Sequence, residues 1–164
     1  MEAAPHGGGP PSFDDTVVQI LASKILIDWL RNRQQLLVPL TLDLQKLEPA
    51  QAETLLQAMV VAAQAHGPLE AADRERLTAA LRLTNAAEAQ HATLAATIGH
   101  AKSLHEVLEA VPDVQAGALV YAASLLALDR RKRVNRYYLR YLAARLQLPR
   151  DLVRSLEQRF TTAV

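Results

Sequence analysis

Residues 65–73, with the sequence AHGPLEAAD, bring together three side chains that can bind a metal ion. His66, Glu70 and Asp73 offer one imidazole and two carboxylates where one predicted helix ends and the next begins. Oxygen-rich sets of this kind favour Mg²⁺, Ca²⁺ or Mn²⁺. The same residues also suit helix ends, because the helix dipole favours a cation at a C-terminus and anions in a first turn. The sequence leaves both interpretations open, and the second is the simpler.

Residues 127–138, ALDRRKRVNRYY, concentrate positive charge and tyrosines. Lys/Arg side chains with interleaved aromatics are typical of nucleic-acid grooves, and basic clusters also bind anionic membranes. The alternative is a solvated turn whose positive charges balance acidic residues elsewhere in the chain. If the stretch binds a partner, we expect an acidic protein or an anionic membrane surface in preference to nucleic acid. The residues predicted to form this surface are Arg130, Arg131, Lys132, Arg133, Arg136 and Arg140.

Residue types needed for several kinds of catalysis are missing. The chain has no cysteine, which excludes disulfides, thiolate metal sites and thiol nucleophiles. His91, His100 and His105 are not spaced to share one helical face, which argues against a zinc site. No nucleotide-binding loop, G-x-S-x-G or H-E-x-x-H motif occurs. We therefore expect a protein that is not an enzyme and has no cofactor, apart from a weakly bound divalent metal.

Helices must position these side chains. Half of the 164 residues are hydrophobic, mostly Ala and Leu, and 4% are aromatic, which favours an all-α fold. We predict a single-domain bundle of about seven or eight helices. Periodicity, N-cap residues, Gly and Pro place them at about 14–35, 49–66, 71–83, 86–98, 103–111, 114–128, 135–146 and from 149 onward. The uncharged helix at 114–128 is predicted to be central and buried.

Two short stretches suggest an internal repeat. RLTAALRL (76–83) and YLAARLQL (141–148) share three leucines and one alanine, and each follows a helix and a polar loop. We therefore predict two pseudo-repeated helix-loop-helix units. In the second unit, Tyr138 and Tyr141 share a helical face with neighbouring leucines, so some of the tyrosine cluster is expected in the core.

Residues 1–13, rich in Gly and Pro, predict a disordered lead, followed by one domain over 14–164. The lead does not resemble a secretory signal, and the longest uncharged run is shorter than the roughly 20 residues of a spanning helix. We expect no integral membrane segment and a cytoplasmic location. Charge is unevenly divided: residues 129–164 have a net charge of +7 and residues 1–128 a net charge of −6. This division favours an anionic partner or internal pairing between the halves.

The stretch VPDVQAGALVYAASLLALD (111–129) resembles the second half of the TerB-like helical proteins, a superfamily named for a tellurite-resistance protein. Its uncharacterised bacterial branch, which includes inner-membrane proteins, continues with D-x-D-x-x-x-E and then R-x-Y-L-x-x-L-A. Asp129 matches the first acid, whereas Arg131 and Asn135 replace the other two. The matches in the following helix are Arg136, Tyr138, Leu139, Leu142 and Ala143.

The first half resembles the same family, whose loop usually reads A-D-G-x-I-D-x-x-E. His66 stands where the family has its first acid, and Gly67 is kept. At the other two acidic positions the types are exchanged: Glu70 stands where the family has Asp, and Asp73 where it has Glu. We call residues 65–73 the first loop and residues 129–135 the second loop. The resemblance covers about 47–160 and implies a bundle in which both loops gather acids for a divalent metal. It implies Asp129 as a further ligand, but Arg131 opposes a metal shared by the two loops.

Taken together, the sequence predicts a non-catalytic TerB-like helical domain that acts as an interaction module through its basic second loop. It is expected in the cytoplasm, or peripherally at the inner membrane as the resemblance suggests. Two alternatives remain. One is a divalent-metal-binding, stress-response domain similar to tellurite-resistance proteins, and the other is a nucleic-acid-binding protein that uses the basic patch.

Overall fold

The computed structural model describes residues 21–24 and 41–161. The chain divides into two units, Met1–Gln35 and Leu36–Val164. In the first unit, residues 21–24 are helical. The rest of the helix predicted at 14–35 and the lead predicted at 1–13 lie outside the described residues. All that follows concerns residues 41–161 of the second unit.

Every element of secondary structure in this part of the chain is a helix, and it has no strands, which confirms the predicted all-α class. The elements are a 3-10 helix, η1 (Leu44–Lys46), and seven α-helices. In chain order these are α2 (Pro49–Ala63), α3 (Ala71–Leu83), α4 (Glu88–Gly99), α5 (Leu104–Glu109), α6 (Val114–Ala127), α7 (Arg133–Arg145) and α8 (Arg150–Thr161).

Several helix starts follow from signals in the sequence. Pro49 is the first residue of α2, where its missing N–H is no loss. Ser103 and Glu106 form a capping box at the start of α5, in which the Glu106 backbone N–H donates to the Ser103 hydroxyl at 3.3 Å. Asp113 caps α6 by accepting from the Ala116 backbone N–H at 2.8 Å. These contacts satisfy N–H groups that have no partner within their own helix.

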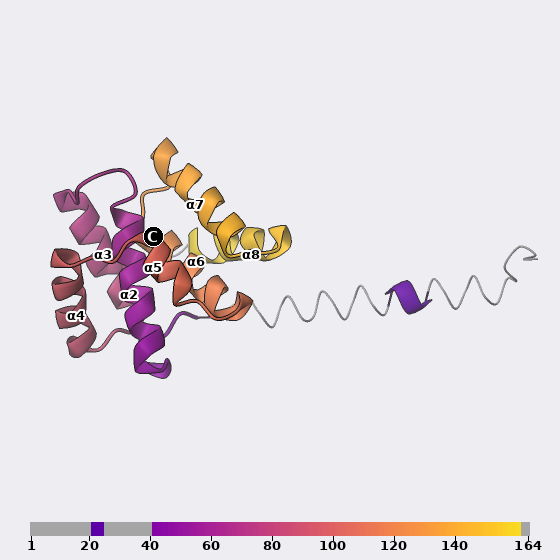
Figure 1. The fold of residues 1–164 in the computed structure, drawn as a ribbon, viewed down its shortest axis with the longest axis horizontal. Helices are drawn as coiled ribbons and strands as arrows, with labels where there is room; N and C mark the ends of the chain where they lie inside the picture. The colour runs from indigo at the N-terminus through magenta and orange to yellow at the C-terminus, as the bar shows by residue number, and fades with distance from the viewer. Residues whose placement is uncertain (1–20, 25–40, 162–164) are drawn as a thin grey trace, which may run out of the picture. The chain divides into compact units, whose positions relative to one another are not determined.

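The core lies around α2 and α6, the two helices in the middle of the bundle (Figure 1). Figure 1 shows α3 and α4 on one side of them and α7 and α8 on the other. Every residue of α6 from Gly117 to Ala127 except Leu119 is buried, which confirms that this helix is central. The largest fully buried side chains include Tyr121, Met59 and Leu142, from α6, α2 and α7. In the described ranges, no helix is long and apolar enough to cross a membrane.

The two predicted helix-loop-helix units are present, but their correspondence differs from the sequence match. Both α3 and α7 are 13 residues long. Each is followed by a residue with positive φ, Asn85 or Gln147. The next backbone N–H then bonds back, from Ala86 to Leu81 and from Leu148 to Ala143. These equivalent Schellman ends pair Leu83 with Arg145, about one turn away from the predicted pairing of 83 with 148.

Candidate functional site

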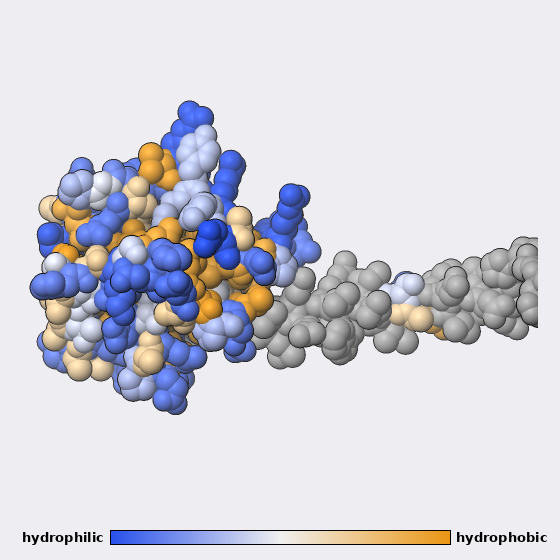
Figure 2. Space-filling view, in the orientation of Figure 1, coloured by the Kyte–Doolittle hydropathy of each residue, from blue (hydrophilic) through white to orange (hydrophobic). Residues whose placement is uncertain are grey.

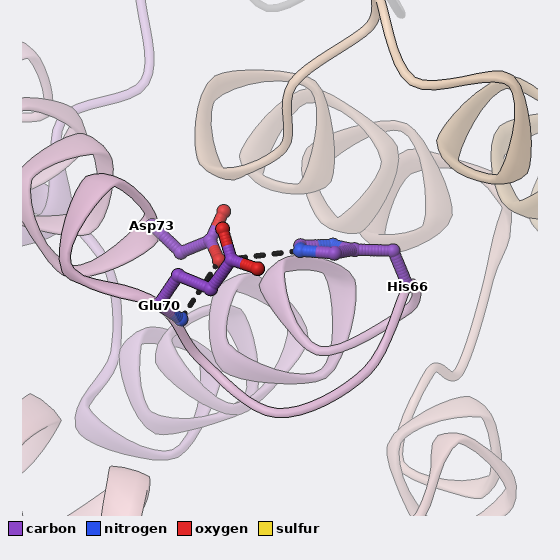
Figure 3. Close-up of side chains that lie close together, drawn as sticks. All are labelled: His66, Glu70 and Asp73. Atoms are coloured by element: carbon purple, nitrogen blue, oxygen red, sulfur yellow. Dashed lines mark hydrogen bonds and ion pairs between the residues drawn. The ribbon is translucent and has the colours of Figure 1, made fainter.

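The first loop brings its three predicted ligands together (Figure 3). One ligand atom from each of His66, Glu70 and Asp73 lies within 4.8 Å of the others. His66 Nε2 is 3.2 Å from Asp73 Oδ2, and both side chains are largely buried. Glu70 is mostly exposed. A carboxylate pair and an imidazole in this arrangement form a compact, electron-rich cluster, which we call the first-loop cluster.

The backbone of the first loop explains this convergence. Helix α2 ends at Ala63, three residues before His66, and the chain continues in turns to Gly67, whose φ is +132°. The predicted end of this helix, at residue 66, was therefore too late, and Gly67 lies in the loop beyond the helix end. Asp73, in the first turn of α3, accepts from the Glu70 backbone N–H at 3.0 Å. This bond fixes the Asp73 carboxylate beside His66.

Lys132 of the second loop completes the cluster from the other repeat unit. Its Nζ is 2.7 Å from His66 Nε2 and 3.9 Å from Glu70 Oε2. An ammonium has only donors, so the contact with His66 is a hydrogen bond only when Nε2 carries a lone pair. The neutral ring then carries its proton on Nδ1, which is buried without a hydrogen-bond partner. Sequence reasoning assigned Lys132 to an outward surface and missed this contact.

The first-loop cluster has one feature that suits a divalent metal and one that opposes it. The donor set suits one, because an imidazole nitrogen and two carboxylates are common ligands of divalent ions. The charge does not suit one, because the Lys132 ammonium already lies against the imidazole nitrogen Nε2 and a carboxylate of the same set. A divalent ion would lie beside this positive charge, and like charges at such distances repel. The cluster as it stands therefore does not fit a resident divalent metal.

Asp129, the fourth predicted metal ligand, is not part of the first-loop cluster. Its carboxylate accepts from the backbone N–H of Arg131 at 2.9 Å and from the guanidinium of Arg131 at 3.1 and 3.2 Å. The guanidinium of Arg76, from α3, also lies 3.6 Å from the Asp129 carboxylate. The Arg131 hydrogen bond is the main reason that the pKa of Asp129 is lowered. Asp129 thus organises the second loop and pairs with arginines.

The predicted basic surface is divided by the structure into two parts. Arg131 and Lys132 bind acidic partners, as described above, and Arg136 donates to the backbone carbonyl oxygens of Arg130 and Arg131 at 3.3 and 3.1 Å. Arg130 lines a surface cleft together with Arg76 and Asp129. These contacts hold the second loop in its conformation. Much of the predicted partner surface is therefore engaged in internal bonds, in agreement with the alternative of internal charge pairing.

The second part continues along α7. We call Arg133, Tyr137, Arg140, Tyr141 and Arg145 the α7 face; all are exposed. Arg133, predicted to be in the loop, is instead the first residue of α7. Its guanidinium donates to the Tyr137 hydroxyl at 3.1 and 2.9 Å.

Cation–π contacts connect the remaining members of the α7 face. The guanidinium carbons of Arg133 and Arg140 lie 5.5 and 5.9 Å from the centre of the Tyr137 ring. Arg145 lies 6.0 Å from the Tyr141 ring. Stacking of this kind holds long side chains in one geometry. This stripe was not predicted from the sequence; the spacing of residues 133, 137, 141 and 145 by four is the signal that could have identified it.

The two tyrosines predicted to share the core face differ in the structure. Tyr138 is partly buried and packs against the core, and burial raises its pKa to about 12. Tyr141 is half exposed, at 50%. The prediction placed Tyr141 on the core face with its neighbour Leu142. Adjacent residues of a helix are about 100° apart, which is enough to turn Tyr141 toward solvent while Leu142 is buried. The apolar face of α7 is narrow, and its buried residues are Asn135, Leu139 and Leu142.

The fold and these contacts define an all-helical protein whose two loops are joined by charged side chains. The family models give the more particular assignment. Residues 16–160 match a family described as "Protein of unknown function (DUF533)", and the chain belongs to this family. No curated protein and no solved structure matches the chain.

Proposed function

We propose that this chain is a non-catalytic interaction module that binds an acidic protein segment through the α7 face. The observation that carries the proposal is the charge of α7, which contains four arginines and no acidic residue. Three of these arginines and two half-exposed tyrosines lie along one stripe. Figure 2 shows mainly hydrophilic side chains over the protruding part of α7. A cationic, aromatic surface of this kind complements an acidic partner.

The residue types favour a protein partner over a membrane. Arg and Tyr are enriched among the residues that contribute most to protein–protein affinity. Their mutual stacking also reduces the entropy lost when a partner orders them. A helix that lies in a membrane needs a broad apolar face turned toward the lipid. Leu139 and Leu142 of α7 are instead buried in the core, and Val134 is its exposed large aliphatic residue.

The proposal keeps three expectations drawn from the sequence. The fold is proposed to be TerB-like, on the evidence of the sequence motifs and of the paired helix-loop-helix units with equivalent helix ends. The protein is proposed to be no enzyme, because its clustered ionisable groups, in the first-loop cluster and around Asp129, are engaged with one another or with cations. A cytoplasmic location is proposed from the sequence alone.

The test compares three anionic probes. Fluorescence anisotropy measures binding of a labelled oligoglutamate peptide and of labelled oligothymidine, and co-sedimentation measures binding to phosphatidylglycerol vesicles. We expect the oligoglutamate to bind, with an affinity that decreases as salt is added. Reversing Arg133, Arg140 and Arg145 to Glu should abolish this binding.

A matched variant separates the α7 face from net charge. Arg150, Arg154 and Arg159 of α8 are also exposed, and reversing them to Glu changes the net charge by the same amount. This second variant should retain binding. Equal losses in the two variants would show a nonspecific charge effect and overturn the proposal. Binding of oligothymidine alone, lost in Tyr137→Ala with Tyr141→Ala, would replace it with the nucleic-acid alternative.

A further inference from the structure

The disagreement between the first-loop cluster and a divalent metal points to a different cation. The cluster supplies His66 Nε2 and the carboxylates of Glu70 and Asp73. The cation that contacts these ligand atoms is a side chain of the protein itself: the ammonium of Lys132, from the other helix-loop-helix unit. We propose that the Lys132 ammonium is the resident cation of the first-loop cluster. It thereby excludes divalent metals from a set of three side-chain ligands.

The spacing of the ligand atoms supports a metal site that the lysine masks. His66 Nε2 and Asp73 Oδ2 are 3.2 Å apart. Two atoms that each lie about 2.1 Å from one ion, with an angle of about 100° between them, have the same separation. Asp73 is oriented independently of any ion, because its Oδ2 accepts from the Glu70 backbone N–H at 3.0 Å. The ligands are therefore preorganised by the loop and the start of α3.

The position of Lys132 explains how an ammonium takes this role. Lys132 is the N-cap residue of α7, and its backbone N–H donates to the Asp129 carbonyl oxygen at 3.2 Å. Arg131, the preceding residue, is occupied by Asp129. The turn therefore separates the two cations: Arg131 pairs within the second loop, and Lys132 crosses to the first. One side chain joins the two loops, which are distant in sequence.

The inference is independent of the proposed binding of an acidic partner, because the α7 face does not include Lys132. Its test is the effect of Lys132→Ala on metal binding, measured by calorimetric titration of Mn²⁺ and Zn²⁺ and by thermal melts with each ion. The unaltered protein should show no site-specific binding. Lys132→Ala should bind at least about tenfold more tightly and should melt at a higher temperature with metal present.

Three further variants restrict the interpretation. Lys132→Arg retains the charge and should not gain metal binding. Lys132→Ala combined with His66→Gln removes a ligand and should lose the gain. Lys102 also forms an ion pair, with Glu53 at 3.3 Å, so Lys102→Ala is the matched control for loss of a paired lysine. It should not gain a site. Metal binding by the unaltered protein through His66, or no gain in a folded Lys132→Ala variant, would overturn the proposal.

A measurement on the unaltered protein tests the proposal even where Lys132→Ala does not fold. Long-range ¹H–¹⁵N NMR spectra distinguish the two neutral tautomers of a histidine. The hydrogen bond from Lys132 requires a lone pair on His66 Nε2, so we expect the proton on Nδ1. A proton on Nε2 would mean that His66 donates to Asp73 instead. The ammonium would then not be held by the imidazole, and the proposal would be refuted.

Discussion

Gly67 determines the path of the first loop, and replacing it by alanine should destabilise the protein. Its φ of +132° lies in a region that residues with a Cβ rarely adopt. An added Cβ meets nothing within 4 Å, so the expected cost comes from backbone strain and not from a collision. Such strain costs about 1–3 kcal/mol, and the lower entropy of unfolded alanine offsets a fraction of it. We expect a net loss of about 1–2 kcal/mol.

Two other glycines provide controls within the same domain. Gly117 lies inside α6, and a Cβ there meets the side chains of Leu146 and Leu148 at 3.5 Å, an ordinary packing distance. Gly117→Ala should stabilise the protein by about 1 kcal/mol, because glycine is unfavourable inside a helix. Gly99 is the last residue of α4 and has open space around it. Gly99→Ala should change stability by less than Gly117→Ala.

Urea denaturation followed by circular dichroism measures all three variants. The midpoints should follow the order Gly117→Ala, Gly99→Ala, unaltered protein and Gly67→Ala, from highest to lowest, with similar m values. The melting temperature of Gly67→Ala should be lower by roughly 3–8 °C. A Gly67→Ala variant as stable as the unaltered protein would refute the argument from strain. It would show that the first loop adopts another path at no cost.

Two further predictions concern the second helix-loop-helix unit, which contains α6 and α7. Asp129 has a lowered pKa, so its contribution to stability is present above its unfolded pKa and is lost as the pH falls through its folded pKa. Arg131→Ala should raise the pKa of Asp129 in an NMR titration and move acid unfolding to higher pH; an unchanged pKa would contradict the pairing. Gln147 has a φ of 52°, which glycine adopts more easily. Gln147→Gly should therefore raise the free energy of unfolding by about 0.5–1 kcal/mol, measured by urea denaturation. Asn85→Gly is the control and should not gain, because Asn85 also donates to Asp43 at 3.3 Å.

Local signals in the sequence were sufficient for much of the fold. The capping box at Ser103 and Glu106 gave the start of α5, and the absence of charge identified α6 as the central helix. The convergence of His66 and Asp73 was also predictable, because both lie in one short loop. The start of α7 was placed too late because Arg133 was counted with its charged neighbours. Its helical position depends on the preceding turn, which Asp129 closes.

Long-range contacts were beyond local signals. Nothing in the spacing around Lys132 distinguishes it from Arg131, although one reaches the first loop and the other folds back on Asp129. The difference arises because the repeat units bring their loops together, which requires the packing of α2, α3, α6 and α7. The register of the repeat was likewise ambiguous, since Ala and Leu match in several alignments. The hydrogen bonds that end α3 and α7 remove the ambiguity.

The corrected register of the repeat aligns the two loops residue by residue. It makes Asp73 and Asn135 equivalent, each buried in the first turn of its helix. Asp73 orients the first-loop cluster, whereas Asn135 donates to the Asp129 carbonyl oxygen at 2.8 Å and thereby fixes the second loop.

The second loop therefore combines a neutral amide at the buried position with cations at its tip, and its lysine meets the acids of the first loop. This internal pairing accounts for part of the charge difference between the two halves of the chain. Exposed arginines remain on both α7 and α8, but α8 also carries Asp151 and Glu157, so the exposed arginines whose own helix has no acidic residue lie on α7. An anionic partner is accordingly expected there and not at the loop from which the helix begins.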